Sequence, residues 1–201
     1  MIEAIIGFVG VIVGSMITLA HEIWRFHAHK EKTAYYSAIR IISVLDEYFQ
    51  HCVDVAFDNG TSEGRPAGRT DDGQDFYEAQ IKRPKAPVYS EDVDWKSLPN
   101  DLTYEILSLS GLARDTDRFI DVSAEHAFPP DYQEFFDARQ IGYAKIGLEV
   151  FSLIAKLRDK YSLAEKNYAQ WNPDWKPEQR LKELIAERTK EQPASNILEE
   201  T

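Results

Sequence analysis

The most apolar stretch of the chain lies at its N-terminus. Residues 4–20 read AIIGFVGVIVGSMITLA, a run of 17 residues without a charge. As a helix this run spans about 26 Å, at the short end for a bilayer core of about 30 Å. Trp24 and Phe26 follow where interfacial aromatic side chains are expected. The pattern predicts a single transmembrane anchor over residues 1–26 that contacts the lipid bilayer through residues 4–20.

This stretch has two other interpretations. Thr18-Leu19-Ala20 resembles a signal-peptide cleavage site, but the preceding Met-Ile-Glu-Ala carries an acid and no Lys or Arg. A buried helix of a soluble protein can also be apolar on every side, but only inside a large protein. The sequence therefore favours a membrane span.

Small residues recur along one face of the predicted span. Gly10 and Gly14 form a GxxxG pattern, which Gly7 and Thr18 extend in both directions. Small residues four apart let two helix backbones approach closely in lipid, although glycine is common in membrane helices anyway. We expect self-association through Gly7, Gly10, Gly14 and Thr18.

The following segment has the spacing of a bundle helix. No Gly or Pro occurs from Ser15 to Phe57, so the span can continue as one helix beyond the membrane. Apolar residues alternate at three and four along it, which is an a/d heptad spacing. This seam comprises Tyr35, Ala38, Ile42, Leu45, Phe49, Cys52 and Ala56. We expect a membrane-proximal helix over residues 27–57.

Residues 58–97 lose this periodicity and are rich in glycine, proline and acids. Such a long connection is functional or partly disordered. We expect a partly disordered loop, with disorder over 60–74 and partial order over 76–97. The apolar pieces Phe76–Ile81 and Val88–Tyr89 either dock on the bundle or pair as a short hairpin.

Residues 98–190 complete the predicted bundle. A second helix starts near Pro99 and ends about Glu125. A third spans roughly Pro130 to Tyr161, where apolar residues recur every seven positions: Phe136, Tyr143, Val150 and Leu157. A short helix covers 178–190, and residues 191–201 form a disordered tail. The fold class is all-α: one transmembrane helix, then an antiparallel bundle of about three long helices plus a short C-terminal one.

The distribution of charge limits the class of partner and indicates the membrane orientation. The net charge is −11, and residues 1–32 carry three acids and three Lys or Arg, so the excess lies in 33–201. Such a domain repels nucleic acid and anionic lipid. Arg25, Lys30 and Lys32 follow the span, which favours an outward N-terminus and a cytoplasmic C-terminal domain. The lone Cys52 excludes an intramolecular disulfide and suits a reducing compartment.

No residue pattern predicts catalysis, a cofactor or a metal. His21, His27 and His29 lack the i,i+3 or i,i+4 spacing of a helical ligand pair. His51 and Cys52 are adjacent, so on a helix they point apart. The acids of 58–97 lack the ladder of a calcium loop. Phosphate-loop and hydrolase motifs are absent from the sequence.

Two tryptophans in a proline-flanked connection are candidates for a partner contact. Trp171 and Trp175 belong to a residue type enriched in interaction hot spots. The alternative is that they cover one end of the bundle core, as large aromatics often do.

The sequence predicts a membrane-anchored interaction or scaffold protein with no enzymatic activity. Its cytoplasmic bundle is expected to bind a protein partner or a second copy. One alternative is an exported or envelope-spanning structural protein with the bundle outside the cytoplasm. Another is an unrecognised enzyme or metal-binding domain.

Overall fold

Four helices account for most of the described chain. The computed structural model describes residues 2–129, 132–168 and 174–195, with backbone alone for 2–13 and 191–195. The helices are α1 (Ile2–Ala56), α2 (Asn100–His126), α3 (Gln133–Lys160) and α4 (Pro177–Ser195). The all-α prediction and the helical bundle are confirmed.

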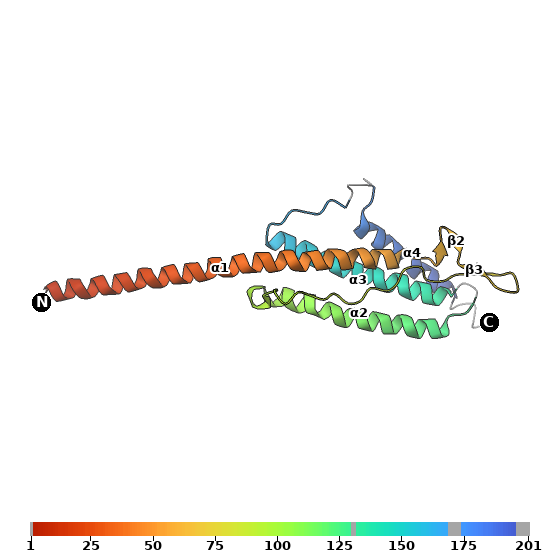
Figure 1. The fold of residues 1–201 in the computed structure, drawn as a ribbon, viewed down its shortest axis with the longest axis horizontal. Coiled ribbons are helices and arrows are strands. Elements are labelled where there is room, and N and C mark those ends of the chain that lie inside the picture. The colour runs from red at the N-terminus through yellow and green to blue at the C-terminus, as the bar shows by residue number, and fades with distance from the viewer. Residues whose placement is uncertain (1, 130–131, 169–173, 196–201) are drawn as a thin grey trace.

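Helix α1 is one continuous helix of 55 residues. The absence of Gly and Pro between Ser15 and Phe57 leaves nothing to interrupt it. All side chains from 14 to 32 are exposed, and Ala34 is the first buried one. The N-terminal half of α1 projects alone beyond the bundle (Figure 1). Within the described residues, no helix is both long and apolar enough to span a membrane, so the structure does not support the predicted transmembrane helix.

Helix α3 lies at the centre of the bundle and packs against α1, α2 and α4. It runs antiparallel to α1, because Arg139 near its start contacts Asp58 and Arg158 near its end contacts Asp46. It also runs antiparallel to α2, where Lys156 contacts Glu105. Helices α1 and α2 therefore run in the same direction, whereas helices consecutive in sequence alternate in direction in an up-and-down antiparallel bundle (Figure 1).

The parallel pair is made possible by residues 78–98, which we call the strap. It returns from the end of α1 toward the start of α2, running between the two helices (Figure 1). Asp94 N–H donates to Ser37 Oγ of α1 at 3.1 Å, and the Tyr89 hydroxyl reaches the Ile106 carbonyl of α2 at 3.5 Å. A short 3-10 helix, η1 (Trp95–Ser97), packs on α1 at the strap's end. The strap thus occupies the groove between α1 and α2.

The core follows the predicted seams with a few departures. The α1 seam is buried except for Tyr35, which is 39% exposed although Ala34 beside it is buried. Phe136, Tyr143, Val150 and Leu157 of α3 are all buried. A Cβ at Gly142 would lie 2.7 Å from Thr116 Cγ2 of α2. Glycine in this periodic helix therefore permits a close neighbour.

Two small hairpins occupy the segment for which the sequence suggested disorder. Strands β1 (Thr61–Ser62) and β2 (Arg65–Pro66) pair antiparallel, as do β3 (Gly68–Arg69) and β4 (Asp75–Phe76). Glu63 and Gly64 both have positive φ, at 51° and 75°, as a two-residue type I′ turn requires. Gly64 and Gly73, two of the glycines of this segment, lie in the turns of the two hairpins.

Candidate functional site

The predicted self-association stripe lies on the projecting part of α1. Gly7 and Gly10 belong to the part described by backbone alone. A Cβ added at Gly14 would meet nothing within 4 Å, and the Thr18 hydroxyl donates to the Gly14 carbonyl at 3.0 Å. This face is open, and self-association through it stays a prediction.

Only one of the two candidate tryptophans lies among the residues that the structure describes. Trp171 lies outside the described residues. Trp175 is half-buried, and its ring centroid lies 5.9 Å from that of Phe57 at the end of α1. This contact suits the core-covering alternative, while a partner contact through either tryptophan remains untested.

The histidines after the apolar stretch stand on an exposed helix. The His27 ring nitrogen Nδ1 lies 2.8 Å from the Ile23 carbonyl, one turn earlier. Among the residues that the structure describes, no group of three or more His, Cys, Asp or Glu side chains is placed to hold a metal ion.

The most developed polar cluster was not predicted and lies where α1 ends. Asp58 and Arg139 form an ion pair of 2.9 Å, with side chains only 2% and 3% exposed. The Asp58 carboxylate also accepts from the backbone N–H of Gly60 at 3.0 Å and of Ile81 at 2.9 Å. Arg139 Nη2 donates in addition to the Ile81 carbonyl. Burial lowers the pKa of Arg139, and the Asp58 carboxylate opposes that shift. This cluster joins α1, the strap and α3.

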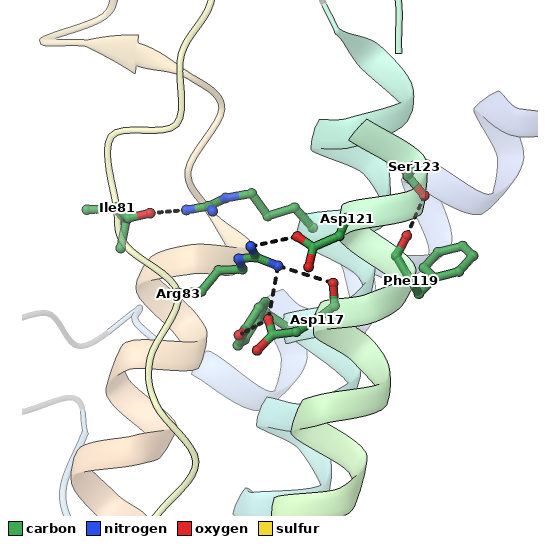
Figure 2. A network of polar contacts seen from close by, with 8 residues as sticks. Ile81, Arg83, Asp117, Phe119, Asp121 and Ser123 are labelled. Atoms are coloured by element: carbon green, nitrogen blue, oxygen red, sulfur yellow. Dashed lines mark hydrogen bonds and ion pairs between the residues drawn. The ribbon is translucent and has the colours of Figure 1, made fainter. Parts of the chain in front are cut away.

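A second ion-pair group fastens the strap to α2. Arg83 donates to Asp117 Oδ1 at 3.2 Å and to Asp121 Oδ1 at 2.8 Å (Figure 2). The Tyr143 hydroxyl of α3 donates to the same Asp117 carboxylate at 2.9 Å. Burial alone would lower the pKa of Arg83, but the two carboxylates raise it. One arginine of the strap is thus linked to both α2 and α3.

The interior between α1 and α3 holds groups that titrate only at high pH. Burial raises the pKa of the Tyr48 hydroxyl, with further contributions from nearby Cys52 and Tyr143. Burial also raises the pKa of the Cys52 thiol. The pKa of Tyr143 is raised by burial first and then by its bond to Asp117. None of these groups is a ready nucleophile at neutral pH, because each strongly favours its protonated form.

These shifts predict alkaline destabilisation. The folded-state pKa of each buried tyrosine lies above its unfolded value near 10, so the folded state holds its proton more tightly. This stability is fully present below pH 10 and is lost as pH rises, by about 1.4 kcal/mol per pH unit for each group. Urea titrations between pH 8 and 11.5 should show this fall.

The matched variants are Tyr48→Phe and Tyr104→Phe. Tyr48→Phe should flatten the alkaline slope by about 1.4 kcal/mol per pH unit. Tyr104 is 76% exposed on α2, so Tyr104→Phe should leave the slope unchanged. An equal slope in wild type and Tyr48→Phe would contradict this account.

Both ion-pair groups serve architecture rather than chemistry. The carboxylates of Asp58 and Asp117 are already engaged by protein donors, so neither presents a free base to a substrate. One sequence signal for the cluster existed. Arg139 and Gln140 follow Phe136 by three and four residues, which places them on the buried face of the α3 repeat, and a buried cation needs a partner.

Comparison with known proteins assigns this chain neither a family nor a function. No family model matches this chain, and no curated protein or solved structure is significantly similar to it.

Proposed function

We propose that this chain is a single-pass membrane protein whose helical bundle binds another protein or a second copy. The observation that carries the proposal is the projecting half of α1. Six large apolar side chains on it are between 55% and 68% exposed: Met16, Ile17, Leu19, Ile23, Trp24 and Phe26.

Such a helix is not expected to persist alone in water. Most helix stability in proteins comes from packing an apolar face, and the described side chains of this half, residues 14–32, are all exposed. Insertion of residues 4–20 into a bilayer would remove their apolar side chains from water and retain every backbone hydrogen bond within the helix. Trp24 and Phe26 would then lie at the interface.

The proposed arrangement holds the bundle away from the lipid. From Ala20 to Ala34 the helix rises about 21 Å. Arg25, Lys30 and Lys32 lie in this interval and favour its placement on the cytoplasmic side, which leaves the N-terminus outside. The acidic bundle is repelled by anionic lipid, which also favours this separation.

The partner is proposed to be a protein rather than a nucleic acid. All of the net charge of −11 lies in residues 33–201, so phosphate backbones are repelled and a basic protein surface is attracted. A non-enzymatic interaction or scaffold role agrees with the engaged carboxylates of the two ion-pair groups.

Membrane fractionation tests the anchor. Wild-type protein should stay in membranes after an alkaline carbonate wash, whereas a variant lacking residues 2–26 should move entirely to the supernatant. Val11→Lys with Ile12→Lys should act similarly, because two central lysines cost about 5 to 7 kcal/mol on insertion. Retention of the deletion variant in washed membranes would overturn the proposal.

The matched control places the same lysine on the bundle. Ile39 and Leu107 are 40% and 49% exposed there, so Ile39→Lys and Leu107→Lys should leave fractionation unchanged. Parallel fusions after Thr201 then test orientation. Activity of a cytoplasmic reporter alone is expected, and activity of an exported reporter alone would place the bundle outside.

A further inference from the structure

An open groove lies at the end of the bundle opposite the projecting half of α1. It has a volume of about 580 Å³ and is formed by the exit of strand β4, the last turns of α2 and the start of α3. Its wall consists of Phe76, Tyr77, Glu78, Ala79, Ala124, Tyr132 and Phe135. Four of these seven residues are aromatic, and all four are half-buried.

The four rings line the groove and do not pack on one another. Among the described residues, no ring of the four is in ring contact with another of the four; Phe135 instead meets Phe136, with centroids 5.2 Å apart. The hydroxyls of Tyr77 and Tyr132 make no hydrogen bond to a described residue. Both hydroxyls can therefore hydrogen-bond to a ligand.

The charge of the groove has one sign. Glu78 is exposed, and within the described chain its carboxylate has no ion-pair partner. The wall contains no Lys, Arg or His. Aromatic faces are electron-rich, so rings beside an unpaired carboxylate favour a cation and disfavour an anion.

We propose that this groove binds an organic cation, presented as the lysine or arginine side chain of a protein partner. The proposal deepens the proposed function, on which it rests for the partner being a protein. The aliphatic stem of such a side chain would lie along the rings, with its charged end near Glu78. The net charge of −11 would attract a basic partner toward the bundle.

The position of the groove argues against a lipid headgroup. Residues 20–56 of α1 rise about 54 Å, and strand β4 follows beyond the end of that helix (Figure 1). A bilayer that holds residues 4–20 is therefore out of the groove's reach. A soluble or membrane-proximal protein can reach it.

The test compares a charged probe with its neutral isostere. Full-length protein in detergent micelles, with labelled Phe and Tyr rings, is titrated by NMR with N-acetyl-arginine methylamide and with the citrulline analogue. We expect saturable shifts at Tyr77 and Tyr132 with the arginine probe, and at least about fivefold weaker binding of citrulline. Equal binding of the two, or none, would overturn the proposal, as would binding of phosphocholine in preference to arginine.

Four variants test whether the groove residues cause the binding. Glu78→Gln should weaken arginine binding about three- to tenfold, whereas Asp72→Asn, the same charge change at an exposed loop position, should not. Tyr77→Leu should weaken binding and Tyr77→Phe should retain it. These titrations do not depend on the membrane, so fractionation can fail while they succeed, and the reverse.

Discussion

Replacing Asp58 with alanine is expected to lower the free energy of unfolding by about 3 to 5 kcal/mol, because it leaves the Arg139 charge buried without its partner. Arg139 has only 3% of its side chain exposed, so water cannot replace the lost carboxylate without local opening. Urea titration of the full-length chain in mild detergent, followed by tryptophan fluorescence, measures the change.

The loss should extend to the strap. The Asp58 carboxylate also accepts from the N–H groups of Gly60 and Ile81, and Ile81 is the point where the strap meets α3. Removing this acceptor leaves the buried N–H of Gly60 and the part-buried N–H of Ile81 without their partner, which is costly. Hydrogen exchange should therefore accelerate over 78–98 more than over the central turns of α3.

Two comparisons distinguish the loss of the Asp58–Arg139 ion pair from the loss of a carboxylate in general. Asp54 lies one turn earlier on α1, is exposed and contacts Gln50, so Asp54→Ala should change stability by less than about 0.5 kcal/mol. Asp58→Leu combined with Arg139→Met should recover much of the Asp58→Ala loss, because an apolar pair needs no partner. Equal losses for Asp54→Ala and Asp58→Ala would contradict the role of the buried pair.

The helices themselves could be predicted because their signals are local. The seven-residue recurrence of Phe136, Tyr143, Val150 and Leu157 places these side chains on one face, and all four are buried. Proline at position 99 marked the start of α2 to within one residue. The uninterrupted run from Ser15 to Phe57 indicated that α1 could be a single helix.

The direction of the helices could not be predicted in the same way. Whether α2 runs with or against α1 depends on the path of the strap, which has no periodic pattern. That path is held by pairs distant in sequence, such as Asp58 with Arg139, 81 residues apart. Arg83 and Asp117 are 34 residues apart and are equally invisible to a local spacing argument.

The aromatic groove could not be predicted from local sequence patterns either. The aromatic groove joins residues from a hairpin and two helices, and none of its four rings stands in a recognisable motif. The predicted candidates, in contrast, were chosen by residue type and local spacing. Such a choice finds stripes and connections, but it does not find surfaces assembled by the fold.

Replacing Gly60 with alanine should cost about 2 to 4 kcal/mol of folding free energy. Gly60 has a φ of +75°, a left-handed conformation that disfavours a side chain. A Cβ there would also lie 2.4 Å from the Phe136 ring of α3, which is buried and cannot swing into solvent. Chemical denaturation of the full-length chain measures the loss.

Gly64→Ala isolates the backbone part of this effect. Gly64 has the same φ of +75°, but a Cβ there would meet nothing within 4 Å, so only about 1 kcal/mol should be lost. In a Phe136→Leu background, Gly60→Ala should cost less folding free energy than in the wild type, because the ring edge with which the new Cβ would clash is absent. An equal cost in both backgrounds would mean that the turn does not rest on α3. The expected coupling between the two substitutions would show that Gly60 rests on Phe136. This contact lies beside the buried Asp58–Arg139 pair, where the end of α1 meets the start of α3.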